Sequence, residues 1–344
     1  MLTSQFNYNL PAKLIAQKPL LKRDLSRLLV LDKNSGQTKH CHFFDLPKLL
    51  QPNDVLVFNN SKVFKARLTA TKPTGGKLEI FLLREINAST WEAMIGGRGG
   101  DVGLVIKFNK NLSGKIIKQN ENLREIKFNL SGKKLQAAID KLGAIPLPPY
   151  IKQTAKLDRY QTVYAKTRGS VAAPTAGLHF TKKLLAQLKK KHIQLEYVTL
   201  HVGLGTFAPI KADKIENHKI HTEFATVDSA TAKRLNQYKK QGRRIIAVGT
   251  TTVRTLEAFA KNPHSSNPHP TLSLEGRGEI DLYITPGYKF KFVDAMITNF
   301  HLPQSSLLVL VSAFAGYNKT MTAYQTAINK KYRFYSFGDA MFIS

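Results

Sequence analysis

The chain has 344 residues and a mass of 38.5 kDa, which is large for a single hydrophobic core and fits two domains. Its hydrophobic fraction of 42% and charged fraction of 22% exclude a disordered or fibrous protein. The longest apolar run, residues 307–315, is far shorter than the ~20 residues that cross a bilayer. Residues 1–9 lack the pattern of a signal peptide, and the single Cys41 excludes an internal disulfide or a thiolate metal cluster. We therefore expect a soluble, cytoplasmic protein.

The charge is strongly positive, with 52 Lys and Arg against 23 Asp and Glu, a net charge of +29 and a pI near 10.1. Such a surface attracts polyanions at long range, which favours a nucleic-acid partner. A merely solubilising surface is the alternative, because the basic clusters at 189–191 and 239–240 fall at predicted helix ends and complement the helix dipole. The sequence contains no zinc-finger, RNP or GxxG recognition motif.

The predicted elements of the first half are mostly strands. Residues 27–32 and 55–59 are short apolar runs typical of buried strands. Closely spaced short strands, separated by glycine turns, follow between residues 65 and 130, and they favour a small closed barrel because closure removes exposed edges. These strands are predicted at 77–83, 91–95, 104–108, 115–118 and 124–129. An amphipathic helix then begins after Ser131 and ends at Gly143, before a proline-rich connector.

The second half alternates between helices and strands, which is typical of a layered α/β structure. Helices are predicted at 181–191, 229–241, 307–315 and 323–331, with strands at 193–200 and 244–248 and a helix after the turn at 249–252. Residues 262–278, rich in Pro, Gly and Ser, are predicted to form a surface loop without a core of its own.

Two segments combine small residues with a histidine. In Ser170–Phe180 the small residues allow a ligand to approach the backbone, and His179 lies directly before a helix; a tight core turn with a hydrogen-bonded histidine is equally consistent. Residues 201–207 follow a predicted strand, at the edge where α/β sheets bind ligands. Their Gly-x-Gly is only a fragment of a dinucleotide-binding motif.

Two further segments carry binding groups. The Gly249–Arg254 turn offers amides and hydroxyls to a phosphate, a carboxylate or a ribose, although Thr251 or Thr252 could simply cap the helix. No lysine follows in the Walker position, which excludes a P-loop. His218 and His221 have a zinc-compatible spacing, but no third ligand of the usual type is near, and we expect no metal. The residues alone predict a polar pocket on an α/β scaffold and do not identify a reaction.

Longer motifs run through the chain in order. The two strongest are Val-Ala-Ala-Pro-Thr-Ala-Gly-Leu-His-Phe-Thr at 171–181 and Leu-His-Val-Gly-Leu-Gly-Thr-Phe at 200–207. The others lie at 14–17, 23–27, 58–60, 66–68, 147–151, 159–164, 247–254, 286–288, 297–303 and 332–340. Together they closely resemble the S-adenosylmethionine:tRNA ribosyltransferase-isomerases of queuosine biosynthesis. Residues 109–135 and 262–278 are unlike that family, so we assign no function to them.

The resemblance implies a fold and a reaction. The fold is a discontinuous α/β main domain, residues 1–65 and 149–344, into which a small antiparallel β-barrel domain, residues 66–148, is inserted. The reaction transfers and isomerises the ribosyl moiety of S-adenosylmethionine onto 7-aminomethyl-7-deazaguanine at the tRNA wobble position. It forms epoxyqueuosine and releases adenine and methionine. S-adenosylmethionine is then consumed as a co-substrate, and no cofactor stays bound.

The implied chemistry assigns roles to residues in the motifs. A base must remove a proton from the ribose 5′-carbon, and histidine is suited to such transfers near pH 7. We expect His179 and His201 to be catalytic, with His221 and His301 as second choices. Substrate binding is predicted for Thr175, Gly177, Thr206, Thr250, Thr251, Arg254 and Asn299, with Arg254 as a bidentate clamp on the methionine carboxylate. Contacts with RNA are predicted for Asn59, Asn60, Arg67, Arg159, Tyr160 and Tyr164.

A core or capping role is as consistent with each single position as a chemical one. The expected partners are S-adenosylmethionine and the anticodon loop of a queuine-family tRNA, with no membrane, and the protein is expected to be a monomer. Two other functions remain open. A non-catalytic tRNA-binding protein on the same fold would bind RNA without consuming S-adenosylmethionine. A methyltransferase would release S-adenosylhomocysteine, but the chain lacks the usual glycine-rich first strand-turn of that class.

Overall fold

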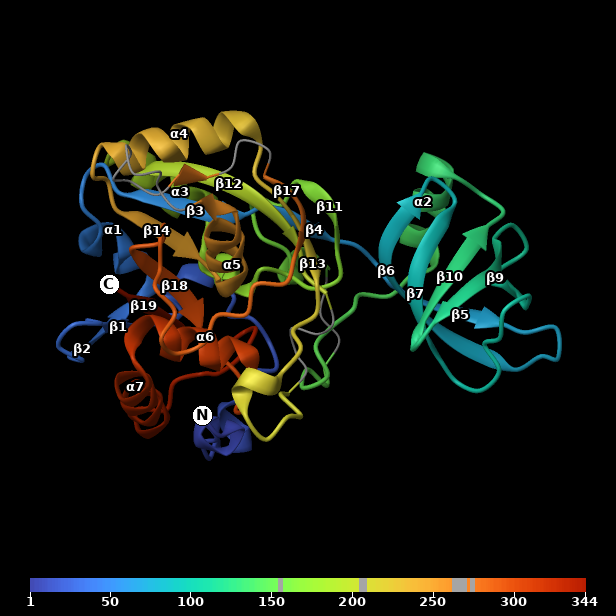
Figure 1. Ribbon diagram of the computed structural model, residues 1–344, viewed down its shortest axis with the longest axis horizontal. Coiled ribbons are helices and arrows are strands. Elements are labelled where there is room, and N and C mark those ends of the chain that lie inside the picture. Colours follow the sequence, from blue (N-terminus) through green and yellow to red (C-terminus); the bar gives the residue numbers. More distant parts are fainter. Residues whose placement is uncertain (154–156, 204–208, 262–270, 273–275) are drawn as a thin grey trace. The chain divides into compact units, whose positions relative to one another are not determined.

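The computed structural model describes the chain apart from residues 154–156, 204–208, 262–270 and 273–275 (Figure 1). The chain forms two compact units. The first comprises Met1–Ser61, Pro148–Thr167 and Ala173–Ser344, and the second comprises Lys62–Leu147 and Arg168–Ala172. The first unit is therefore discontinuous in sequence, with the second inserted into it.

A nine-stranded mixed sheet forms the centre of the first unit, in the order β17-β13-β12-β3-β14-β18-β19-β1-β2 (Figure 1). Its strands are β1 (Arg27–Leu31), β2 (Thr38–His42), β3 (Val55–Asn59), β12 (Gln194–His201), β13 (Glu223–Thr226), β14 (Ile245–Val248), β17 (Arg277–Ile280), β18 (Ala295–Asn299) and β19 (Ala340–Ile343). The four neighbours β12, β3, β14 and β18 run parallel. Their carboxyl ends therefore meet at one edge of the sheet.

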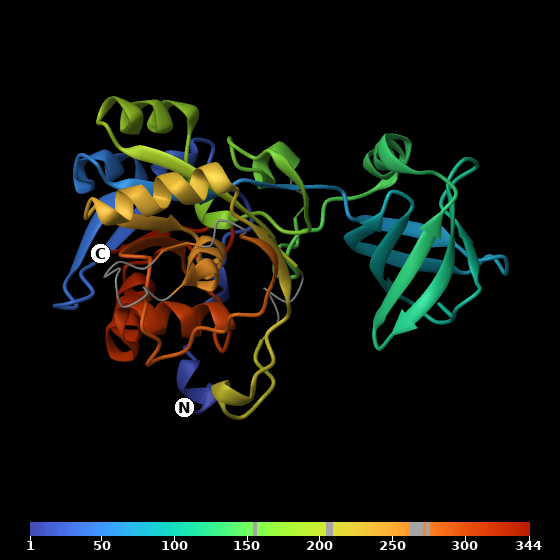
Figure 2. The same ribbon diagram turned by 45° about the horizontal axis from the view of Figure 1, so that its top comes forward.

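Helices cover both faces of this sheet, because successive side chains of a strand point to opposite faces. One face packs against α1 (Leu46–Leu49) and α3 (Lys182–Lys190), and the other against α4 (Ser229–Lys240), α5 (Thr250–Phe259), α6 (Ser306–Ala315) and α7 (Tyr317–Asn329). In β3, for example, Leu56 and Phe58 belong to the first core and Val55 and Val57 to the second. Figure 2 shows α3 above the sheet and α6 and α7 below it.

The second unit contains a closed antiparallel barrel of six strands, in the order β10-β7-β6-β5-β8-β9. The strands are β5 (Arg67–Thr71), β6 (Lys77–Asn87), β7 (Thr90–Gly96), β8 (Val105–Lys107), β9 (Ser113–Asn120) and β10 (Leu123–Phe128), followed by α2 (Gly132–Leu142). Gly114 faces the barrel interior, where an added Cβ would lie 2.7 Å from Ile126 Cγ2. Two small sheets complete the described strands: β4 (Ser61–Val63) with β11 (Thr167–Ser170), and β15 (Ala260–Lys261) with β16 (Thr271–Leu272).

The predicted fold class, an α/β main domain with a small antiparallel barrel, is confirmed. One detail of the prediction was wrong: the last helix begins at Tyr317, earlier than expected. Within the predicted surface loop 262–278, the described residues include β16 and the start of β17, which pairs with β13. Most of that loop lies outside the described residues. In the part of the chain that is described, no helix combines the length and hydropathy needed to span a membrane.

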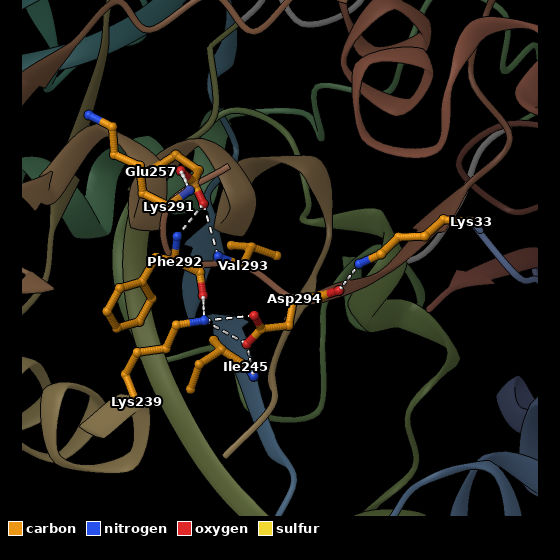
Figure 3. A network of polar contacts seen from close by, with 8 residues as sticks. All are labelled: Lys33, Lys239, Ile245, Glu257, Lys291, Phe292, Val293 and Asp294. Atoms are coloured by element: carbon orange, nitrogen blue, oxygen red, sulfur yellow. Dashed lines mark hydrogen bonds and ion pairs between the residues drawn. The ribbon is translucent and has the colours of Figure 1, made fainter. Parts of the chain in front are cut away.

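A buried carboxylate fixes the segment that leads into β18 (Figure 3). Glu257, on α5, is 2% exposed and accepts hydrogen bonds from the backbone nitrogens of Lys291, Phe292 and Val293 at 2.9–3.0 Å, and from the Tyr288 hydroxyl at 3.1 Å. Asp294, which directly follows Val293, forms an ion pair with Lys239 of α4 at 2.7 Å and accepts a hydrogen bond from Ile245 N of β14. These contacts set the position of β18 and therefore of the residues at its carboxyl end.

We expect Glu257→Gln to lower the free energy of unfolding by about 2–4 kcal/mol, because the amide nitrogen of glutamine would face backbone donors. Tyr288→Phe, which removes only one of the four donors, should cost about 1 kcal/mol. Urea denaturation of both variants measures the difference. A Glu257→Gln variant as stable as the wild type would contradict this role of the carboxylate.

Candidate functional site

A pocket of about 530 Å³, part of it open to solvent, lies at the carboxyl edge of the parallel strands. The chain segments that follow three strands contribute to it: Val202 after β12, Gly249–Thr251 after β14, and Asn299–Leu302 at the end of β18. Its other lining residues are Tyr150, Ala173, Pro174, Thr175, Ala176, Thr298, Leu307, Tyr335 and Ser336. We call this the neutral pocket, because none of its described lining residues is Asp, Glu, Lys or Arg.

The turn from β14 into α5 depends on a glycine. Gly249 has a φ of +94°, which disfavours any residue with a Cβ, and it occupies the N-cap position of α5. The expectation that Thr251 or Thr252 caps this helix was therefore wrong; the Thr252 hydroxyl donates to Val248 O instead. Thr250 and Thr251 are buried and line the neutral pocket.

Asn59 joins three elements at this edge. It lies at the end of β3 with 0% exposure. Its Nδ2 donates to Leu200 O of β12 at 3.0 Å and to Thr251 Oγ1 of α5 at 3.3 Å. Its Oδ1 accepts from the backbone nitrogens of Leu200 and Ser61. The side chain is saturated inside the sheet, and in this structure it has no polar group free for the predicted contact with RNA.

His179 is buried behind the neutral pocket, with both ring nitrogens engaged. Nδ1 lies 2.7 Å from Ser26 Oγ, and Nε2 lies 3.2 Å from Asn299 Nδ2. The ring stacks on Phe43 at a centroid distance of 4.9 Å. Burial, reinforced by the positive charges of Arg333 and Arg23, lowers the pKa of His179 to about 3. The imidazole is therefore neutral and has no free nitrogen for a proton transfer to a ligand.

The other candidate histidines occupy three different positions. His301 lines the neutral pocket, with its Nε2 2.7 Å from Thr298 Oγ1, and burial lowers its pKa to about 3. His201 ends β12 and is absent from the described pocket linings; its ring lies over Phe224, and burial lowers its pKa. Its Nδ1 has no hydrogen-bond partner among the described residues. His221 is exposed at a second pocket.

This second pocket, of about 330 Å³, contains the charges that the first lacks, and we call it the charged pocket. In it Arg254 Nη1 forms a buried ion pair with Glu223, and Arg254 Nε donates to Leu282 O at 3.1 Å. Nη2 is left without a partner in the described structure. Of the guanidinium nitrogens that the expected bidentate clamp would use, only Nη2 is available to a ligand in this structure. The other lining residues are Gly203, His218, Ile220, His221, Ser306 and Leu307, the last shared with the neutral pocket.

The described residues contain no cluster of three or more His, Cys, Asp or Glu side chains suited to a metal ion. Among the predicted substrate-binding residues, Thr206 lies outside the described part of the chain. Gly177 has a packing role, because a Cβ there would lie 1.9 Å from Tyr164 Oη.

The residues that were predicted to contact RNA differ in how far their side chains are exposed to solvent. Tyr160, like Asn59, is 0% exposed in this structure, so its side chain is not on the surface that a predicted RNA contact needs. Tyr164 packs its ring against Phe58 and Tyr197. Arg159 donates to the carbonyls of Leu20 and Leu21, and Asn60 accepts from the Thr199 hydroxyl at 2.7 Å. Of these six residues only Arg67, paired with Glu79 at 2.9 Å, is classed as exposed, with 44% of its side chain accessible.

Sequence reasoning missed Ser26, Tyr150 and Tyr335. Tyr335 lines the neutral pocket with a φ of +71°, a backbone conformation unfavourable for a tyrosine. Ser26 and Tyr335 lie inside the motifs at 23–27 and 332–340, but residue type and spacing do not indicate a positive φ or a contact with a histidine 153 positions away.

The two neutral histidines predict a pH dependence of stability. An unfolded histidine binds a proton below about pH 6.5, whereas His179 and His301 stay neutral down to about pH 3 in the folded protein. Their contribution to the free energy of unfolding is therefore complete above pH 6.5. It is lost as the pH falls toward 3, by about 1.4 kcal/mol per pH unit for each histidine. Urea denaturation should show that lowering the pH from 7.5 to 5.0 reduces the free energy of unfolding less in His179→Gln than in the wild type. The exposed His192→Gln is the control, and an equal loss in all three proteins would contradict this burial argument.

Asn59→Ala should lower the free energy of unfolding by about 2–4 kcal/mol, because it leaves Leu200 N and O buried without partners. The neighbouring Asn60→Ala, which removes one hydrogen bond from a partly buried side chain, should cost about 1 kcal/mol. Denaturant titration compares the two variants. If RNA affinity fell in folded Asn59→Ala while its stability did not, the structural role would be refuted.

Comparison with known proteins identifies the family. The family model for "Queuosine biosynthesis protein" matches residues 3–343. The chain is 49% identical to an S-adenosylmethionine:tRNA ribosyltransferase-isomerase of Natranaerobius thermophilus, over 100% of this chain and 99% of that protein, and 47% identical to one of Thermotoga petrophila, over the full length of both. The crystal structure of S-adenosylmethionine tRNA ribosyltransferase from Thermotoga maritima matches 99% of this chain and 100% of its own, with 36% identity and a TM-score of 0.56. The chain therefore belongs to the family of queuosine biosynthesis proteins.

Proposed function

We propose that this protein is an S-adenosylmethionine:tRNA ribosyltransferase-isomerase. It transfers and isomerises the ribosyl moiety of S-adenosylmethionine onto 7-aminomethyl-7-deazaguanine at the tRNA wobble position, and forms epoxyqueuosine, adenine and methionine. The family match over residues 3–343 is the observation that carries this conclusion. The relatives of the same length and name support it.

The two pockets suit the two ends of S-adenosylmethionine. They share Leu307, and α5 passes from Thr250 and Thr251 at the neutral pocket to Arg254 at the charged pocket within about one helical turn. The adenosine moiety fits the neutral pocket, and the methionine moiety fits the charged one. There the unpartnered Arg254 Nη2 donates to the methionine carboxylate, which is a charge-assisted hydrogen bond.

The reaction needs a base for the ribose 5′-carbon, whose protons the adjacent sulfonium makes acidic. Of the histidines at or near the pockets, His201 best meets this need, because its pKa is lowered by burial and its Nδ1 is without a partner among the described residues. A neutral imidazole nitrogen can accept a proton. The structure favours positioning roles for His179 and His301, whose Nε2 atoms are engaged.

The larger unit carries both pockets and is proposed as the catalytic domain. The net charge of +29 supports binding of the anticodon loop of a queuine-family tRNA, with Arg67 and Arg159 as candidate contacts. We further propose that the protein acts as a cytoplasmic monomer and consumes S-adenosylmethionine without a permanently bound cofactor.

The reaction is tested by incubating the protein with S-adenosylmethionine and an anticodon stem-loop that carries 7-aminomethyl-7-deazaguanine. Free adenine, free methionine and the mass of the modified nucleoside are measured. We expect adenine release that depends on the modified base, together with epoxyqueuosine. S-adenosylhomocysteine would indicate a methyltransferase instead, and RNA binding without turnover would leave a non-catalytic tRNA-binding protein.

Arg254→Lys tests the proposed carboxylate contact. It keeps the positive charge beside Glu223 but removes Nη2, so KM for S-adenosylmethionine should rise about 10- to 100-fold, as expected for one charge-assisted hydrogen bond. Decarboxylated S-adenosylmethionine provides the matched control, because it lacks the group that Nη2 binds. If the variant weakened both compounds equally, Arg254 would have only a structural role.

A further inference from the structure

Asn299, a residue of the neutral pocket, has one side-chain oxygen without a hydrogen-bond partner among the described residues. Asn299 ends β18, is 2% exposed and lines the pocket. Its Nδ2 donates to Tyr335 O at 3.1 Å and faces His179 Nε2 at 3.2 Å. Because Nδ2 must face the Tyr335 carbonyl, the orientation of the amide is determined. Oδ1 is then a buried acceptor with no hydrogen-bond partner among the described residues.

The surroundings of Asn299 hold that oxygen in place. Since Nδ2 donates to Nε2, the proton of the neutral His179 ring must lie on Nδ1, where it is donated to Ser26 Oγ. Tyr335 keeps its unfavourable φ of +71° while its carbonyl accepts from Asn299 and from Gly338 N. A buried polar atom left unpaired is costly, so a ligand group or an ordered water that donates to Oδ1 would stabilise the site.

The pocket restricts which ligand donor can reach Oδ1. Its walls are apolar or aromatic at Val202, Leu302, Leu307 and Tyr335. No carboxylate lies among its described lining residues, so an ammonium group would be desolvated there without a counter-charge. A flat, neutral ring that carries an N–H donor fits both the walls and the acceptor.

We propose that Asn299 Oδ1 accepts a hydrogen bond from the exocyclic amino group of the adenine of S-adenosylmethionine, and that His179 is a positioning residue that holds Asn299 for this contact. This inference rests on the proposed function for the identity of the ligand. It makes Asn299 the residue that selects adenine over a purine without the amino group.

The experiment compares S-adenosylmethionine with its analogue in which hydrogen replaces the 6-amino group. Equilibrium dialysis is done with saturating anticodon stem-loop that lacks the aminomethyl group, so that nothing is consumed. The wild type should bind the analogue about 10- to 100-fold more weakly, because the analogue leaves Oδ1 unpaired. Asn299→Ala should bind the two compounds within about twofold of each other.

Two His179 variants separate positioning from chemistry. His179→Gln can place its amide oxygen against Asn299 Nδ2 and should keep most of the discrimination between the two compounds, whereas His179→Phe should lose it. Ser312→Ala removes a buried hydroxyl in α6, outside both pockets, and is the control for general destabilisation. This variant should discriminate between the two compounds as well as the wild type does.

Equal binding of the two compounds by the wild type would overturn the proposal, as would no binding of S-adenosylmethionine at all. Discrimination that persists in Asn299→Ala would also overturn it. Failure of the proposed function has a separate signature, since turnover is measured with the modified stem-loop. Discrimination without turnover would leave the adenine contact intact and refute the reaction.

Discussion

The Asn59 side chain ties together the elements that form the site. It lies at the end of β3, between β12 and β14, and its amide bonds to Leu200 of β12 and Thr251 of α5. Because β12, β3, β14 and β18 run parallel, their carboxyl ends share one edge of the sheet. Asn59 holds the ends of β3 and β12 together at this edge. In α/β sheets this edge is where ligands bind. The positions of Val202, Gly249 and Asn299 in the neutral pocket all follow from this arrangement.

The division of the site into a neutral and a charged pocket follows from burial. The neutral pocket is backed by His179 and lined by His301, which burial keeps uncharged, so the groups around them act as fixed hydrogen-bonding partners. The charged pocket holds the Arg254–Glu223 pair, in which each buried charge compensates the other. S-adenosylmethionine has a matching division, with an uncharged adenine at one end and, at the other, an amino acid that carries an ammonium, a carboxylate and a sulfonium.

Much of the fold could be predicted from local patterns, and less of the site. Sequence alone predicted the strands at 55–59 and 244–248 and the closely spaced strands of the barrel. This was possible because a buried strand appears in the sequence as a local run or alternation of apolar residues. The resemblance placed Thr250, Thr251 and Asn299 among the binding residues, and all three line the neutral pocket. It could not show that Asn59 and Tyr160 are interior, because a polar side chain saturated by distant backbone has the same sequence signal as one that binds a ligand. Nor could it show that His179 is a buried neutral ring, which depends on Ser26 and Phe43, far away in the chain.

We propose that S-adenosylmethionine lies along the carboxyl edge of the sheet, with its adenine in the neutral pocket and its methionine in the charged one. The first experiment to do is a crystal structure of the protein with S-adenosylmethionine and the unmodified anticodon stem-loop. We expect the adenine amino group within hydrogen-bond distance of Asn299 Oδ1 and the methionine carboxylate at Arg254 Nη2. A ligand with its ends reversed, or bound away from this edge, would refute this arrangement.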